Sequence, residues 1–390
     1  MLKQTVFLCA ALTAGMSSAQ VIDANALSAH APAERAFGKL EQVHAFHDAM
    51  PTGVTVAETG RIFVNYPRWG DKVPFTVGEL RDGEVRPFPD LSLNQEDPKD
   101  PAKGLISVQS VVADGRGRVW LLDTAAPGFQ TPRPGGAKLI AVDLASNRIV
   151  KRLVFPENVM LPSTYVNDMR FDFRHGAEGT VYVTDSSLRG PGAIIVMDIA
   201  SGRAERRLSG ALSTSVAPGF VPVVEGTPLM ASQPDGTSKP LSVASDGIAL
   251  SADGQTLYFT PLSSRHLYAV STALLRDPAI SEQRLAAAVE DLGEKGASDG
   301  MEADAEGAVY AGDYEHNAIR KRWPDGRWQT LVHDPRLLWP DTLSIGPDGY
   351  LYFIANQLHR QALFQGGRDL RQKPYALMRL KINAAPAPTH

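Results

Sequence analysis

The chain has 390 residues, of which 43% are hydrophobic, and a formal net charge of −4 at pH 7. This length and apolar content allow a large core, so the fold does not depend on disulfides, and Cys9 is the only cysteine. Lys and Arg are scattered along the chain, which argues against a nucleic-acid-binding protein. The 34 Gly and 28 Pro favour short strands joined by tight turns over long helices.

The first predicted element is a secretory signal peptide at residues 1–19. Lys3 supplies a positive charge, residues 6–12 are apolar, and Ser17-Ser18-Ala19 is a small-residue cleavage site. The apolar stretch is too short for a permanent membrane helix, and no later segment is long enough to span a membrane. We therefore expect a secreted or periplasmic protein whose mature chain, residues 20–390, is a single domain.

A hairpin unit follows, and it recurs six times along the chain. Each copy has a short apolar strand, a turn containing glycine, and a second strand with β-branched and aromatic residues. Asp-Gly and Glu-Gly at the turns favour the positive φ of tight hairpins. The copies lie at residues 53–64, 110–121, 168–183, 247–259, 300–310 and 342–352.

Six such hairpins predict an all-β fold, a six-bladed β-propeller. Apolar segments such as 138–143 and 193–198 supply outer strands, and residues 40–46 and 375–382 are expected to pair and close the ring. A β-sandwich, the rival all-β fold, would not need the same hairpin six times. Residues 209–240 are rich in Pro, Gly, Ser and Thr and predict a long loop over one face.

A polar residue occurs at the same place in every copy. When the copies are aligned on their turn glycines, this residue lies just before the first strand, at the end that faces the central channel of a propeller. The six residues are Thr52, Gln109, Asn167, Asp246, Asp299 and Asp341, and Asp168 stands beside them. Turn formation explains a single Asp or Asn before Gly. Six polar residues in register favour a binding site at the channel mouth.

Three carboxylates in this ring would repel one another without a positive charge among them. A cation bound by oxygen ligands relieves that repulsion, and Ca²⁺ accepts irregular sets of carboxylates, carbonyls and waters. We therefore expect one divalent cation, Ca²⁺, bound by Asp246, Asp299 and Asp341. The expected ligand-binding residues are Thr52, Gln109, Asn167, Asp168 and Asp341.

Aromatic residues near strand ends predict walls for a small organic ligand, namely Trp69, Tyr165 and Trp339. The sequence contains no His-Glu-x-x-His zinc motif and no glycine-rich phosphate loop after a strand. Residues 296–300 match the Gly-x-Ser-x-Gly pattern of hydrolases. That pattern needs a following helix, whereas a predicted strand follows here.

Several of these segments resemble the Yellow/major royal jelly protein family. The segments are 63–69 (Phe-Val-Asn-Tyr-Pro-Arg-Trp), 119–123 (Val-Trp-Leu-Leu-Asp), 166–172 (Val-Asn-Asp-Met-Arg-Phe-Asp), 181–186 (Val-Tyr-Val-Thr-Asp-Ser) and 245–250 (Ser-Asp-Gly-Ile-Ala-Leu). The resemblance runs from about residue 40 to residue 360. It implies a secreted six-bladed propeller; some members bind small amines in the channel, and others are linked to dopachrome conversion. Insect members carry disulfides, so this chain is similar to a bacterial member.

The ring is also similar, more distantly, to that of the gluconolactonase/senescence-marker propellers. The resemblance implies a metal held by a first-blade Glu, a fourth-blade Asn and a fifth-blade Asp, with a third-blade Asn contacting substrate. The matching positions here are Thr52, Asp246, Asp299 and Asn167, respectively. Thr52 departs from the pattern and removes one metal ligand, although Asp341 could restore a charge from the opposite side.

These observations leave three functions open. The first is an exported protein that binds a small organic ligand, such as an aromatic amine, in its channel. The alternative is a divalent-metal-dependent lactone hydrolase with Asp299 and Asp246 as catalytic groups. The third is a platform for protein interactions. We favour the first because Thr52 replaces a key metal ligand, and we expect a monomer with a small-molecule partner.

Overall fold

Each repeated segment forms an antiparallel hairpin in the computed structural model, which describes residues 35–233 and 235–390. The six turn glycines all have positive φ, from 73° at Gly254 to 101° at Gly179. Glycine adopts this backbone conformation without the steric cost that a Cβ brings. The predicted hairpins are therefore confirmed. The expected signal peptide, residues 1–19, lies outside the described residues.

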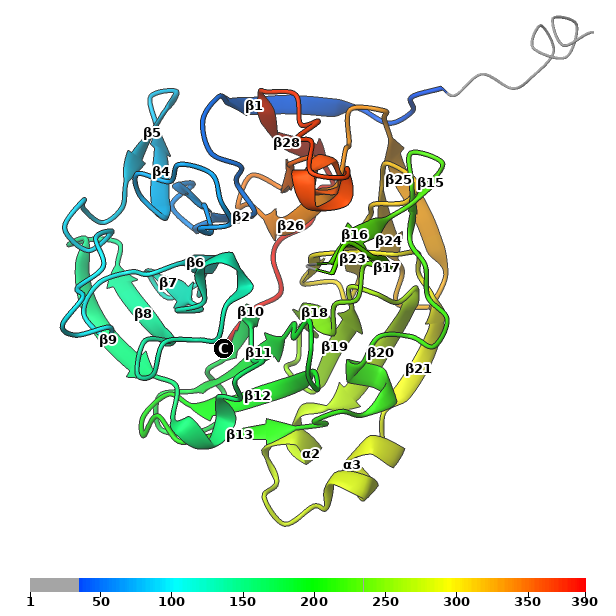
Figure 1. Cartoon of the computed structure of the whole chain (residues 1–390). Coiled ribbons are helices and arrows are strands. Elements are labelled where there is room, and N and C mark those ends of the chain that lie inside the picture. Colours follow the sequence, from blue (N-terminus) through cyan, green and yellow to red (C-terminus); the bar gives the residue numbers. More distant parts are fainter. Residues whose placement is uncertain (1–34, 234) are drawn as a thin grey trace, which may run out of the picture. The chain divides into compact units, whose positions relative to one another are not determined.

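Six four-stranded antiparallel sheets are built on these hairpins, and Figure 1 shows them as blades around a channel. Blade one comprises β2 (Gly53–Val56), β3 (Ile62–Asn65), β4 (Val77–Arg81) and β5 (Glu84–Pro87); blade two β6 (Val108–Ala113), β7 (Arg118–Asp123), β8 (Lys138–Asp143) and β9 (Arg148–Val154); blade three β10 (Val166–Asp172), β11 (Thr180–Asp185), β12 (Ala193–Asp198) and β13 (Ala204–Arg207). Blade four comprises β18 (Ser245–Leu250), β19 (Thr256–Pro261), β20 (His266–Ser271) and β21 (Glu290–Glu294); blade five β22 (Met301–Ala303), β23 (Val309–Asp313), β24 (Ala318–Arg322) and β25 (Trp328–His333); blade six β26 (Pro340–Ile345), β27 (Tyr350–Ala355), β28 (Tyr375–Lys381) and β1 (Leu40–Phe46).

Blade six closes the ring because its outermost strand comes from the opposite end of the described chain. β1 pairs with β28, with Leu40 opposite Leu380 and Phe46 opposite Tyr375. This pairing confirms the closure predicted from residues 40–46 and 375–382. Residues 36–390 thus form the predicted six-bladed β-propeller.

Apolar side chains fill the interfaces between neighbouring blades. Trp120 of blade two lies 4.8 Å, centroid to centroid, from Phe171 of blade three, and both are buried. Separate apolar clusters occupy the other five interfaces around the ring. Burying these side chains stabilises the ring and leaves the polar residues of the inner strands to line the channel.

The insertion between blades three and four has more structure than the sequence predicted. Residues 209–240 contain a 3-10 turn, η3 (Leu212–Thr214), and two short hairpins, not a continuous loop. The hairpins are β14 (Val223–Val224) with β15 (Thr227–Pro228), and β16 (Met230–Ser232) with β17 (Ser238–Pro240). Turn signals in this segment are dense, and sequence reasoning did not resolve the two-residue strands between them.

Helices are few and short. α2 (Thr272–Arg276) and α3 (Glu282–Ala287) connect β20 to β21 in blade four. Over residues 35–233 and 235–390, no helix is both long enough and apolar enough to cross a membrane.

Candidate functional site at the channel mouth

β-Bulges position the polar ring at one end of the channel. In blade three, Val166 pairs with Asp185 and Met169 with Val183, so Asn167 and Asp168 together face one residue of β11. Equivalent bulges lie at Gln109, Asp246 and Asp341. A bulge turns a side chain away from the regular alternation of its strand. The inner strands of these four blades begin earlier than predicted, so their ring residues lie within strands.

One cavity of about 90 Å³ brings five of the predicted residues together. They are Gln109, Asn167, Asp246, Asp299 and Asp341. Thr52 does not line this cavity; it is fully buried, and its hydroxyl accepts a hydrogen bond from Asn65 Nδ2 at 3.0 Å. Asp168 does not line this cavity either; its carboxylate accepts a hydrogen bond from Ser110 Oγ at 2.8 Å.

Neutral donors orient the three ring carboxylates. The hydrogen bonds come from Asn167 Nδ2 (2.6 Å) and Ser186 Oγ (3.0 Å) to Asp246, from Trp339 Nε1 (2.7 Å) to Asp299, and from Asn356 Nδ2 (2.6 Å) to Asp341. These donors hold the oxygens in place without cancelling their charge. A positively charged ligand is therefore not excluded by an existing ion pair.

Burial raises the pKa values of the ring carboxyls. The pKa of Asp299 is raised to about 6. Burial, followed by the negative charge of Asp299, raises the pKa values of Asp246 and Asp341 well above the ordinary value of 3.8. Without a cation, the ring carboxyls therefore keep their protons to a higher pH than an ordinary aspartate does, and a bound cation would favour the release of those protons.

An aromatic wall lines the same cavity. Trp69 and Phe129 stack with centroids 4.8 Å apart, and Phe129 lies 4.8 Å from Tyr165. Trp69 Nε1 donates to the Tyr165 hydroxyl at 2.8 Å, which donates in turn to Gln109 Oε1 at 2.8 Å. Phe129 ends the 3-10 turn η1 (Pro127–Phe129). The wall is thus braced by hydrogen bonds and presents apolar faces beside the acidic ring.

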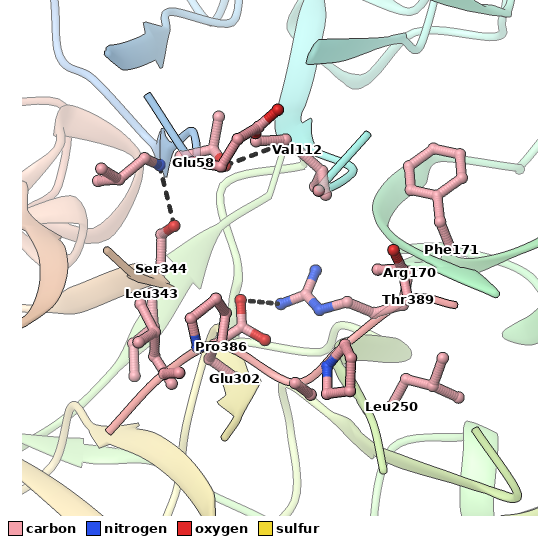
Figure 2. A pocket seen from close by; sticks show the side chains of 18 of the residues that line it. Glu58, Val112, Arg170, Phe171, Leu250, Glu302, Leu343, Ser344, Pro386 and Thr389 are labelled. Carbon is pink, nitrogen blue, oxygen red and sulfur yellow. Dashed lines mark hydrogen bonds and ion pairs between the residues drawn. The ribbon is translucent and has the colours of Figure 1, made fainter. Parts of the chain in front are cut away.

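The far half of the channel has a different composition. Arg170 forms ion pairs with Asp168 (3.0 Å) and Glu302 (3.6 Å), and Figure 2 shows it reaching toward Glu302 across the channel. Beyond this network lies a cavity of about 430 Å³, lined by the inner strands of all six blades and by residues 385–390. Asp168 and Glu302 thus share a charged partner, unlike the carboxylates of the ring.

Comparison with known proteins identifies the family. A family profile described as major royal jelly protein matches residues 106–390. The chain belongs to the major royal jelly protein family. It is 27% identical to protein yellow of Drosophila erecta over 252 residues, and 28% identical to protein yellow of Drosophila madeirensis over 264 residues. These matches cover 60% and 62% of this chain but only 43% of each relative, so they span less than half of the length of those proteins.

Solved structures support the fold of this family member. A calcium-binding regucalcin from Agrobacterium tumefaciens has a TM-score of 0.51 at 14% identity, covering 89% of this chain and 97% of the other. A luciferin-regenerating enzyme has a TM-score of 0.53 at 11% identity, covering 90% and 99%. A putative gluconolactonase has a TM-score of 0.53 at 12% identity, covering 89% and 93%. At these identities, the likeness concerns the propeller fold alone.

The ring of this family member does not fit a resident metal ion in the arrangement observed. Asp246 and Asp341 already accept protein hydrogen bonds, and Thr52 supplies no carboxylate. Within residues 35–233 and 235–390, no group of three or more His, Cys, Asp or Glu side chains is arranged to hold a metal. The predicted calcium site at Asp246, Asp299 and Asp341 therefore stays a prediction that requires these side chains to rearrange.

Sequence reasoning missed three residues of the site. Ser186 and Asn356, which donate to ring carboxylates, each follow the second strand of a blade hairpin, so an alignment of that position would have found them. Phe129 lies in a connection between β7 and β8, outside the repeat, and no repeat signal marks it. Trp339, expected as a wall, instead stands behind Asp299 as its hydrogen-bond donor.

Proposed function

We propose that this protein binds a small aromatic amine at the channel mouth. The ammonium group would contact the acidic ring, and the aromatic ring would pack on the wall formed by Trp69, Phe129 and Tyr165. The observation that carries this proposal is that carboxylates without a charged partner and stacked aromatic side chains line one cavity. The resemblance to amine-binding members of the family supports the same ligand class.

Charge and geometry account for the binding. An ammonium group near Asp246, Asp299 and Asp341 lowers their pKa values, so protons leave as the charge-assisted hydrogen bonds form. An aromatic ring packed on Trp69 adds roughly 0.5–1.5 kcal/mol beyond the area that it buries. Gln109 and Asn167 also line the cavity and would orient polar substituents of the ligand.

Titration calorimetry with tyramine tests the proposal. Tyrosol, in which a hydroxyl replaces the ammonium of tyramine, is the matched neutral ligand. We expect saturable tyramine binding, tyrosol binding weaker by about tenfold or more, and a similar loss for Asp246→Asn and for Asp341→Asn. Asp143→Asn, a change at the half-buried end of β8 in blade two, outside the ring cavity, is the control. Equal affinity for the two ligands, or no tyramine binding, would overturn the proposal.

The lactone hydrolase alternative, with Asp299 and Asp246 as catalytic groups, has less support. The ring would have to give up protein hydrogen bonds to bind Ca²⁺, and Thr52 supplies no carboxylate. Hydrolysis of gluconolactone that requires added Ca²⁺ and is lost in Asp299→Ala would replace the binding proposal with this alternative.

We also propose that the protein is exported and cleaved after Ala19, on the pattern of residues 1–19. Mass spectrometry of the mature protein tests this, with Gln20 as the expected first residue. A mature chain that retains Lys3 would contradict export by cleavage.

A further inference from the structure

The cavity at the ring is too small for the ligand it is proposed to bind. Its volume is about 90 Å³, whereas small-molecule sites typically measure roughly 300–1,000 Å³. An aromatic amine therefore requires the mouth to open. This inference rests on the proposed function, but the movement it invokes is measurable without any ligand.

Charged side chains and a chain segment occupy the far end of the channel. Arg170 and its two carboxylate partners lie across the interior, and the chain segment 385–390 lines the cavity beyond them (Figure 2). Backbone hydrogen bonds fix this segment: Ala387 N donates to Ala303 O at 3.0 Å, and Phe173 N donates to Thr389 O at 2.8 Å. A ligand that enters from the opposite end avoids both the Arg170 network and this segment.

One loop of blade six contributes several side chains to the ring cavity. Residues 357–372, between β27 and β28, contain the 3-10 turns η4 (Leu358–Arg360) and η5 (Ala362–Phe364). Leu358, Gln361, Leu363 and Phe364 of this loop line the ring cavity. Leu363 nevertheless remains 45% exposed, so the cover is only one layer of side chains thick at this point.

Hydrogen bonds within the loop allow it to move as a unit. Its ends are joined, because Gln357 Nε2 donates to Gln372 O at 2.6 Å and Gln372 N donates to Gln357 Oε1 at 2.8 Å. Leu370 N also donates to Arg360 O at 2.9 Å. A loop with adjoining ends and internal packing is an Ω-loop, a type that is frequently functional. Displacement of the whole loop preserves these bonds.

Two carboxylates from elsewhere hold the loop down. Glu225, between β14 and β15, accepts hydrogen bonds from His359 Nε2 at 2.7 Å and from Arg360 Nε and Nη2 at 2.9 and 2.5 Å. At the other side, Asp71 accepts from Arg371 Nη2 and Nη1 at 2.8 and 3.0 Å. Glu225 thus connects the insertion between blades three and four to a loop of blade six.

We propose that residues 357–372 are a lid over the ring and that Glu225 is its latch. The lid also contacts the ring: His359 stacks on Trp339 with centroids 6.0 Å apart, and Trp339 Nε1 donates to Asp299 at 2.7 Å. A ligand that moves Asp299 therefore acts on the lid through one intervening side chain. In this proposal the lid controls access of the ligand to the ring, and a ligand bound at the ring changes the position of the lid.

Limited trypsin digestion of the ligand-free protein tests the latch. Arg360, Arg368 and Arg371 are cleavage sites within the lid. We expect cleavage there to be about tenfold faster in Glu225→Ala, because hydrogen bonds to charged groups are lost. Asp235→Ala, in the neighbouring hairpin of the same insertion, is the matched control and should leave the rate unchanged. Equal rates in Glu225→Ala and the unmodified protein would overturn the latch.

Cross-linking tests whether the lid controls entry. Glu225→Cys with Arg360→Cys, in a Cys9→Ser background, can be joined by a bismaleimide with a reducible spacer. Tyramine association should slow by about tenfold or more when the pair is joined and recover after reduction. An unchanged association rate would overturn the lid. Faster trypsin cleavage in Glu225→Ala without tyramine binding in any variant would instead reject the proposed ligand and retain the lid.

Discussion

The two ends of the channel differ in the hydrogen-bond and ion-pair partners of their buried carboxylates. At the ring, Asp246, Asp299 and Asp341 have neutral donors and raised pKa values. At the far end, Arg170 lies between Asp168 and Glu302. The loop at the ring is attached by the side chains of Glu225 and Asp71 and by one backbone hydrogen bond, from Gln357 N to Leu338 O, whereas several backbone hydrogen bonds fix the segment at the far end.

This difference separates binding from stability. Carboxylates without a charged partner can form a favourable interaction with a bound cation, because no existing ion pair has to be broken first. A paired network contributes little to binding, but loss of one partner leaves an uncompensated charge in the interior. The ring is therefore suited to a ligand, and the far end to holding the inner strands of blades three and five in place. The predictions below test that contrast.

The largest expected effect is at the far end. Arg170→Met leaves Asp168 and Glu302 buried without their cation, which should lower the free energy of unfolding by about 3–5 kcal/mol. Urea denaturation measures this. Arg86→Met, which breaks an exposed pair with Glu84, should cost less than about 1 kcal/mol. Similar small losses in both variants would show that the Arg170 network is not structurally important.

Asp299→Asn should have a pH-dependent effect at the ring. The raised pKa means that the stability Asp299 contributes is complete below its unfolded value of 3.8 and is lost as pH rises to about 6. That interval corresponds to about 3 kcal/mol at roughly 1.36 kcal/mol per pH unit. Unfolding free energies at pH 4 and pH 7 should therefore differ less in Asp299→Asn than in the unmodified protein. Parallel pH profiles would contradict the raised pKa.

Amine affinity should rise with pH. Because the pKa values of the ring carboxyls are raised, ammonium binding displaces protons from those carboxyls that are still protonated, and each proton displaced changes the dissociation constant by about tenfold per pH unit. Tyramine should bind more tightly at pH 8 than at pH 6, while tyrosol binding stays nearly constant. Calorimetry in buffers of different ionisation enthalpy would count the protons. Affinity for tyramine that falls with pH would exclude the ring as the ammonium site.

The smallest effect is expected at the segment that closes the far end. Thr389 Oγ1 donates to Asp114 O at 2.7 Å, and Thr389→Ala should lower the unfolding free energy by about 1 kcal/mol. Tyramine affinity should not change, because the Arg170 network separates this residue from the ring. A loss of affinity without loss of stability would show that the two ends communicate.

The sequence by itself determined the blades, their number and the position of the ring. Turn glycines and strand residues act locally, so each hairpin could be predicted from its own segment. Because the hairpin repeats, the residue just before the first strand of each copy is expected at the same end of the channel. This is why Gln109, Asn167, Asp246 and Asp341 were found together. Thr52 occupies the same repeat position, but β2 has no bulge at that point, and the Thr52 hydroxyl is taken by Asn65 of the paired strand.

Only the tertiary structure determined the partners and the pKa values of those residues. Glu225 and His359 are 134 residues apart, and no local pattern predicts that they meet. The raised pKa values depend on burial and on neighbouring carboxylates, which exist only once six blades close around the channel. Local sequence specifies strands and turns through backbone preferences. Desolvation and long-range pairing depend on which side chains the closed propeller brings together. Desolvation sets the protonation of the polar ring, and long-range pairing sets how the loop over it is held.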